Sequence, residues 1–328
     1  MKLIFAICFV LSFLTTLFLI PYWIKRAKKV GLVGKDMNKF EKPETAEIGG
    51  LSVMIGFLLG ILLLIAIEMF HFNSLERALQ TMALLSSLLM LTILGLIDDI
   101  LGWKIGLKQY QKPLLVLLAA LPIIVINAGN SIVSIPFLGR IDIGLVYAFI
   151  FIPLFIVFFS NAFNMLAGYN GLEASLGSII LFTLGFIAWK EGYGWVAVIA
   201  LCMVAALVAF LLYNKFPSKI FPGDTLTYPV GALIAIIAII GNMERIALIL
   251  FIPYIIEFFI KAKYKFKTEC FAKPQEDNSL EVEKVGSLTH IIIKLLKKVK
   301  TKVYEKNIVS TLIIFELILA TISVIYYW

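Results

Sequence analysis

The chain has 328 residues, of which 61% are hydrophobic and 15% are charged, and its mean hydropathy is +0.98. This composition excludes a soluble globular domain and predicts a polytopic membrane protein, because soluble domains of this length carry far more polar surface. The formal net charge of +8 does not indicate a nucleic-acid partner, since the basic residues adjoin apolar segments.

The apolar segments predict the membrane spans in chain order. A bilayer-spanning helix needs roughly 20 mostly apolar residues. The first segment is long and lacks a small-residue cleavage site, which favours a retained helix over a signal peptide. We therefore predict an all-α membrane protein with one integral membrane domain, residues 1–328. Its expected spans lie near 3–24, 49–69, 78–97, 113–128, 144–160, 172–189, 194–213, 226–241, 246–260 and 307–327.

The distribution of lysine and arginine predicts the orientation of these spans. The loops that follow the odd-numbered spans hold 24 of these residues, whereas the other side, which includes the N-terminus, holds 5. Loops rich in positive charge stay in the cytoplasm. The first set of loops is therefore expected in the cytoplasm, and both termini are expected outside.

Three segments between the spans have patterns of their own. Residues 131–144 alternate and contain a turn at Leu138-Gly139, which predicts an outside β-hairpin. Residues 261–289 form a long cytoplasmic insert, and the alternation of lysines with aromatic residues over 261–267 predicts a strand in it. Residues 290–303 carry lysines at helical spacing, which predicts an amphipathic helix at the membrane interface.

Polar motifs gather on the predicted cytoplasmic face. Each has a simple reading alone, as a polar helix end, a broken helix end or a turn that caps a helix. Together on one face they point to a site, since ionisable groups near a bilayer are costly. The motifs are Asp98-Asp99 after the third span, Asn161, Asn164 and Asn170 after the fifth, Asp224 in a Pro-Gly turn before the eighth, and Glu44 and Glu47 before the second.

The residue types in these motifs favour a hard cation. Adjacent acids such as Asp98 and Asp99 repel each other and need a cation or a shared proton. They also end a helix, where the macrodipole disfavours negative charge. Carboxylate and amide oxygens without a His or Cys cluster suit Mg²⁺, with Mn²⁺ as the alternative.

The order and spacing of the motifs resemble the polyprenyl-phosphate N-acetylhexosamine-1-phosphate transferase superfamily, glycosyltransferase family 4. The matching stretches are Asp98-Asp99 followed by Lys108, "NAFNMLAGYNGLEA", "LLYNKFPSKIFPGDTLTYPVG" and "SLTHIIIKLLKK". The bacterial branches carry an Asp-Gly-Asp type element where this chain has residues 167–170, and a His-rich motif where it has only His290. These departures favour the eukaryotic and archaeal branch, the UDP-GlcNAc:dolichyl-phosphate GlcNAc-1-phosphotransferases, and the composition fits an archaeal source.

The resemblance implies a reaction and its partners. GlcNAc-1-phosphate would pass from UDP-GlcNAc to a polyprenyl (dolichyl) phosphate in the bilayer, with release of UMP. This is the first step of lipid-linked oligosaccharide synthesis for N-glycosylation. A divalent cation would be required, because both substrates are anions.

The resemblance also assigns roles to individual residues. Asn164 and Asp224 match the metal ligands, and the insert would select the sugar. The catalytic positions are Asp98, Asp99 and Lys108, and the substrate contacts are Glu44, Asn161, Asn170, Gly171 and Gly223.

Two alternatives stay open at this stage. The same chemistry could use another UDP-N-acetylhexosamine for a cell-surface polysaccharide. An ion-coupled transporter is the alternative of another class, but transporters place their sites near the midplane and often contain repeats, and neither feature is found here. The oligomeric state, a homodimer included, is equally open.

Overall fold

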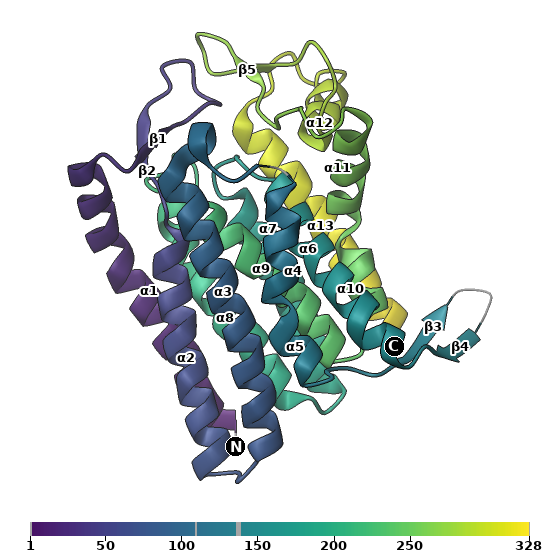
Figure 1. Ribbon diagram of the computed structural model, residues 1–328. Coiled ribbons are helices and arrows are strands. Elements are labelled where there is room, and N and C mark those ends of the chain that lie inside the picture. The colour runs from purple at the N-terminus through teal and green to yellow at the C-terminus, as the bar shows by residue number, and fades with distance from the viewer. Residues whose placement is uncertain (1, 109, 136–138, 328) are drawn as a thin grey trace.

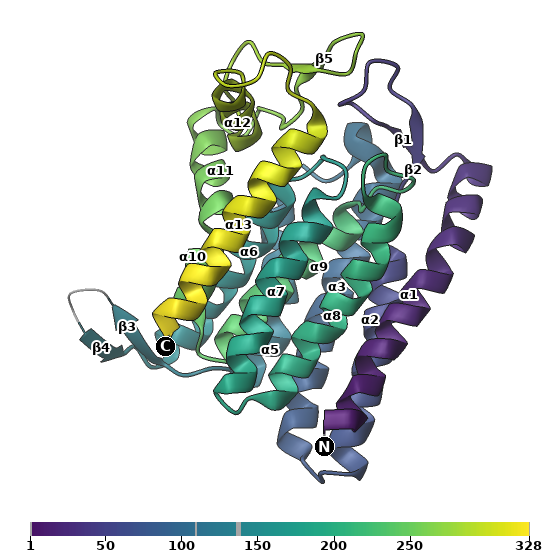
Figure 2. The same cartoon turned by 180° about the vertical axis from the view of Figure 1, so that it is seen from behind.

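The computed structural model describes residues 2–108, 110–135 and 139–327, with the side chains of 2–4, 103–105, 132–135 and 139–141 left aside. Its helices run side by side in one bundle, across which the last helix runs obliquely (Figures 1 and 2). The helices are α1 Lys2–Val30, α2 Gly50–Phe70, α3 Leu75–Ile105, α4 Gln111–Ala119, α5 Leu121–Val125, the π-helix η1 Tyr147–Phe151, α6 Ile152–Met165, α7 Leu172–Lys190, α8 Gly194–Asn214, α9 Asp224–Ile240, α10 Glu244–Leu250, α11 Ile252–Lys263, α12 Leu288–Leu296 and α13 Glu305–Tyr327.

The helical fold predicted from hydropathy is confirmed. Seven helical segments in the described part of the chain have the length and apolar character needed to cross a membrane, and Gln111–Val125 and Asp224–Ile240 are shorter apolar segments. Each of the ten predicted spans overlaps a helix or a consecutive pair of helices. The agreement follows from the bilayer itself, where a spanning segment must satisfy its own backbone hydrogen bonds.

Prolines explain why three predicted spans are interrupted. Pro122 lies in the first turn of α5, Pro153 in that of α6, and Pro253 in that of α11. Proline lacks a backbone N–H and is tolerated in the first turn of a helix, where that N–H has no intrahelical partner. The chain therefore begins a new helical segment at each of these positions.

Short antiparallel strand pairs lie outside the helices. Strands β3 and β4 form the predicted hairpin over 131–144, of which residues 136–138 lie outside the described residues. They lie near the end of α13, whereas β1, β2 and β5 lie at the opposite end of the bundle (Figure 1). The pairs are β1 Val33–Lys35 with β2 Glu44–Ala46, β3 Ile132–Ile135 with β4 Gly139–Asp142, and β5 Lys273–Pro274 with β6 Leu280–Glu281.

The insert differs from its prediction in two places. The strand expected over 261–267 was wrong, because α11 continues to Lys263 and the chain then turns. Lysines are favourable in the last turn of a helix, where they face the negative end of the macrodipole. Helix α12 covers Leu288–Leu296, and residues 297–299 form a turn where the prediction continued the helix to 303.

Helix α9 is the centre of the bundle. All its residues after Asp224 are buried, and it contacts α2, α3, α6, α7, α8 and α10. Gly95 of α3 permits one of these contacts, because a Cβ there would lie 2.5 Å from the carbonyl carbon of Asp224. The first residue of α9, Asp224, is hydrogen-bonded to Asp99 of α3 and to Asn164 in the last turn of α6.

Candidate functional site

Two cavities adjoin at the insert end of the bundle. The first, which we call the loop cavity, has a volume of about 380 Å³ and is lined mainly by residues 35–37, 167–170 and 268–271. The second, the helix cavity, has a volume of about 1210 Å³ and is lined mainly by α3, α4, α6 and α11. Asn164 and Asp224 line both cavities, so they belong to a shared wall.

Asp99 fixes the start of α9 and with it the position of Asp224. Its Oδ1 accepts a hydrogen bond from the backbone N–H of Asp224 at 2.7 Å, and its Oδ2 accepts from the N–H and the hydroxyl of Thr225 at 3.0 and 2.5 Å. The positive end of the α9 macrodipole thus stabilises a carboxylate that lies near the C-terminal end of α3. Gly223 permits this approach, since its φ is +72° and a Cβ would lie 2.4 Å from Asp99 Oδ2.

Replacing Asp99 by alanine should lower the free energy of unfolding by about 2 kcal/mol, because α9 loses its capping acceptor. Asp99→Asn keeps one acceptor oxygen and should lose less. Thermal unfolding of the detergent-purified protein measures both. Equal melting temperatures for Asp99→Ala and the parent would show that this cap does not stabilise α9.

Lys112 joins two of the carboxylates. Its ammonium donates to Asp98 Oδ2 at 2.6 Å and to Asp224 Oδ2 at 2.9 Å, and the other oxygen of Asp98 accepts from the backbone N–H of Leu107 at 2.6 Å. Lys112 lies in the first turn of α4. The lysine therefore connects α4, the end of α3 and the start of α9 at the edge of the helix cavity.

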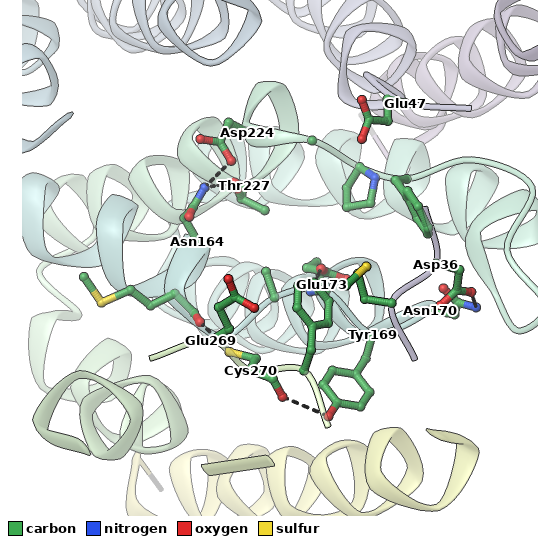
Figure 3. Close-up of a pocket in the computed structure, with 18 of the residues that line it drawn as sticks. Asp36, Glu47, Asn164, Tyr169, Asn170, Glu173, Asp224, Thr227, Glu269 and Cys270 are labelled. Atoms are coloured by element: carbon green, nitrogen blue, oxygen red, sulfur yellow. Dashed lines mark hydrogen bonds between the residues drawn. The ribbon is translucent and has the colours of Figure 1, made fainter. Parts of the chain in front are cut away.

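Asn164 contacts Asp224 from the opposite side. The Asn164 amide group donates to Asp224 Oδ1 at 2.6 Å and to the hydroxyl of Thr227 at 2.8 Å. Figure 3 shows the three side chains pointing toward one another from α6 and α9. The Asn164–Asp224 pair predicted from the sequence is therefore a direct contact, and Thr227 belongs to the same group.

The chemistry of the shared wall fits a hard divalent cation. Asp98 and Asp224 contribute two carboxylates around the single ammonium of Lys112, and Asn164 adds an amide oxygen. Within the described residues, no group of three or more His, Cys, Asp or Glu side chains is arranged as a metal cage. A cation that takes few protein ligands and keeps water and substrate phosphates, as Mg²⁺ does, suits this set of donors.

The structure separates Glu47 from Glu44. Glu47 lines both cavities, and burial, followed by the charge of Asp99, raises the pKa of its carboxyl. Glu44 is an exposed residue of β2, opposite Lys35, and lines neither cavity. The substrate contact predicted at Glu44 stays a prediction, whereas Glu47 lines both cavities.

The other predicted substrate contacts fall in different places. Asn161 lines the helix cavity and donates to the carbonyl of Val157 in its own helix at 2.8 Å. Asn170 lines the loop cavity. The backbone N–H of Gly171 donates to Asn214 Oδ1 at 3.1 Å, so this N–H is already occupied.

Lys108 lies away from the carboxylates. Its ammonium is 5.9 Å from the ring centroid of Tyr110, its backbone N–H donates to Gln111 Oε1 at 2.8 Å, and it lines neither cavity. Its catalytic role stays a prediction. The lysine that contacts Asp98 and Asp224 is Lys112, four residues later.

The insert closes one side of the loop cavity. His290 accepts from the backbone N–H of Gly286 at 3.1 Å through Nδ1, and its Nε2 lies 2.9 Å from the carbonyl oxygen of Phe271. The Phe271 ring lies against Gly168, where a Cβ would come within 2.7 Å of it. Cys270 is buried beside them, which raises the pKa of its thiol to about 11. These contacts indicate a structural role for His290.

Known proteins resemble this chain over most of its length. A profile of glycosyl transferase family 4 matches residues 81–242. A Saccharolobus solfataricus protein, named provisionally as a UDP-N-acetylglucosamine–dolichyl-phosphate N-acetylglucosaminephosphotransferase, is 40% identical over 322 residues, which are 97% of this chain and 94% of the relative. The Dictyostelium discoideum protein of that name is 27% identical over 283 residues, 75% of this chain and 68% of the relative. A Clostridium botulinum phospho-N-acetylmuramoyl-pentapeptide-transferase is 35% identical over 189 residues, 54% of this chain and 57% of the relative.

Proposed function

Because the chain belongs to glycosyl transferase family 4, we propose that it transfers GlcNAc-1-phosphate from UDP-GlcNAc to a polyprenyl phosphate of the dolichyl type. The products are lipid-diphosphate-GlcNAc and UMP. One observation carries the proposal. Asp224 and Asn164 stand in a wall between a cavity lined largely by loops and a cavity lined largely by helices, where a soluble nucleotide sugar and a lipid phosphate can meet.

The helix cavity suits the lipid phosphate. Tyr110 and Leu154 line it and are 69% and 59% exposed, so its rim opens on the apolar side of the bundle between α4 and α6. An isoprenoid chain can lie there while its phosphate reaches inward. The Lys112 ammonium at the inner end provides a counter-charge for that phosphate.

The loop cavity suits the nucleotide sugar. Its walls come from the loops at 35–37 and 167–170 and from the insert at 268–271. A nucleoside held among these loops places its diphosphate at the shared wall. Glu47 and Thr268 of the insert line both cavities, so a sugar next to that diphosphate can contact either of them, and the insert can select it.

The reaction exchanges one phosphoanhydride for another. A lipid phosphate oxygen forms a bond to the sugar-bearing phosphorus of UDP-GlcNAc, the bond from this phosphorus to the bridging oxygen breaks, and UMP leaves with that oxygen. The attacking phosphate is largely ionised near neutral pH, so no general base is strictly required. Catalysis then depends on positioning and electrostatics. Lys112 supplies charge, Asp98 orients Lys112, and Asp99 holds the start of α9.

Asp224 and Asn164 are the residues that would hold Mg²⁺ or Mn²⁺. The cation would neutralise charge on the diphosphate. We place the site in the cytoplasm and both termini outside, in accord with the basic loops on the site's side of the bundle. The product would then begin a lipid-linked oligosaccharide for N-glycosylation.

An assay with purified protein tests this function. With labelled UDP-GlcNAc, a polyprenyl phosphate and Mg²⁺, we expect equal amounts of lipid-linked product and UMP. EDTA should abolish both, and added Mg²⁺ or Mn²⁺ should restore them, because both substrates and the carboxylates of the site are anionic. Product from UDP-GalNAc in preference to UDP-GlcNAc would change the assigned sugar. No UMP from any UDP-sugar, with folded protein, would favour a transporter instead.

A further inference from the structure

A buried ion cluster lies beside the loop cavity, apart from the shared wall. It consists of Asp36 and Lys39, from the connection between β1 and β2, and Glu305, the first residue of α13. These residues are 5%, 9% and 2% exposed. The Lys39 ammonium contacts a Glu305 carboxylate oxygen and lies 3.3 Å from Asp36 Oδ2. Two carboxylates thus share one ammonium.

The cluster holds Asn170 at two points. Glu305 Oε1 accepts from the backbone N–H of Asn170 at 2.6 Å, and Asp36 Oδ2 accepts from its side-chain amide at 3.1 Å. Asn170 is itself 5% exposed and lines the loop cavity beside Asp36 (Figure 3). Both contacts are hydrogen bonds to charged groups, the stronger kind.

Neighbouring contacts extend this restraint along the loop. The side-chain amide of Asn38 donates to the carbonyl of Gly168 at 2.9 Å, and the backbone N–H of Gly168 donates to Glu173 Oε1 at 2.6 Å. The loop at 167–171 is therefore held from the β1–β2 connection, from α7 and from α13. Of the acidic residues that hold it, only Glu305 comes from the C-terminal part of the chain.

The burial of this ion cluster costs free energy, so stability alone does not explain it. Removing charges from water costs more than a single ion pair usually returns, and breaking such a pair leaves an uncompensated charge. Cation–π contacts offset part of this cost, since the ammonium groups of Lys39 and Lys306 lie 4.4 and 4.5 Å from the ring centroid of Phe216. The cluster fixes the position of Asn170.

We infer that Glu305 is a positioning residue for the nucleotide subsite, which it shapes through Lys39, Asp36 and Asn170. The inference rests on the proposed function. Glu305 and Lys39 line neither cavity, so they act on affinity for the nucleotide and touch no reacting atom. The C-terminal helix therefore sets the affinity for the UDP-sugar and leaves the affinity for the lipid phosphate unchanged.

Steady-state kinetics with each substrate varied in turn test this inference. Glu305→Ala should raise the KM for UDP-GlcNAc roughly tenfold, the loss expected for one charged hydrogen bond. The kcat and the KM for polyprenyl phosphate should stay within about twofold. Binding of UMP, followed by calorimetry, should weaken by a similar factor. Glu316→Ala is the matched control, because Glu316 is a buried acid of the same helix that lines neither cavity.

Two further variants separate an effect on the position of Asn170 from an effect on folding. Lys39→Met leaves Asp36 and Glu305 without their shared ammonium and should weaken UMP binding more than Glu305→Ala does. Adding Glu305→Gln removes one charge and keeps an acceptor for the Asn170 N–H, so the double variant should recover most of the lost affinity.

Other results would overturn the inference. These are unchanged UMP affinity in Glu305→Ala, equal rises in both KM values, a fall in kcat alone, or no recovery in the double variant. If Glu305→Ala does not fold, the comparison of Lys39→Met with the double variant decides. A parent protein that binds UMP but turns over no UDP-sugar would instead refute the proposed function.

Discussion

Replacing Asp224 by asparagine should reduce kcat with UDP-GlcNAc by roughly 10³-fold, the size of loss seen when one preorganised electrostatic group is removed from an active site. Asp224 is the acceptor shared by Asn164 and Lys112, and it is one of the two residues proposed to hold the divalent cation. The substitution keeps the shape of the side chain and removes its charge. Formation of UMP at saturating substrate measures the effect.

Two comparisons make this result specific. Asp277→Asn alters an exposed aspartate of the insert that pairs with Lys302, and its activity should equal that of the parent. Titration of Mn²⁺ followed by electron paramagnetic resonance should show weaker binding in Asp224→Asn. If the variant turned over at the parental rate and bound Mn²⁺ equally well, the metal assignment would be refuted while the transferase assignment survived.

Replacing Lys112 by methionine should lower kcat/KM for the lipid phosphate by roughly 10²- to 10³-fold. The long apolar side chain of methionine fills much of the same space, but the ammonium between Asp98 and Asp224 is lost. Without it the two carboxylates repel each other and the incoming phosphate has no counter-charge. Initial rates at several lipid phosphate concentrations measure the change.

Lys108→Met provides the decisive comparison, because family resemblance favours Lys108 and geometry favours Lys112. The Lys108 ammonium lies over the ring of Tyr110, and we expect its removal to change kcat/KM by less than about threefold, the effect of a weak exposed cation–π contact. A large loss in Lys108→Met with a small one in Lys112→Met would restore the role predicted from the sequence.

These two lysines show a distinction that the sequence alone could not make. The chain leaves helical geometry at Gly102, whose φ is +69°, and a new helix begins at Gln111. Resemblance favours Lys108, and helical spacing from Asp99 cannot be carried across such a break, so the sequence does not predict that Lys112 contacts Asp98 and Asp224. The strand predicted over 261–267 was wrong because a few alternating lysines also fit the last turn of a helix.

Hydropathy predicted the helices well, since a bilayer allows few alternatives for a spanning segment. The predicted spans also placed four polar residues at one end of the bundle, namely Asp98, Asp99, Asn164 and Asp224. Hydropathy could not predict the cluster of Lys39 and Glu305, because these residues are 266 positions apart and neither lies in a recognisable motif. Only the packing of α13 against the loops brings them together.

The burial of α9 on every side has a consequence for how the protein is assembled. In hydropathy α9 resembles any other span, yet it begins with a carboxylate and meets protein on all faces. Five of the helices that contact it, α2, α3, α6, α7 and α8, precede it in the chain, and α10 follows it. A ribosome therefore delivers α9 after these five helices have been made, and Asp224 enters a membrane that already contains Asp99 and Asn164.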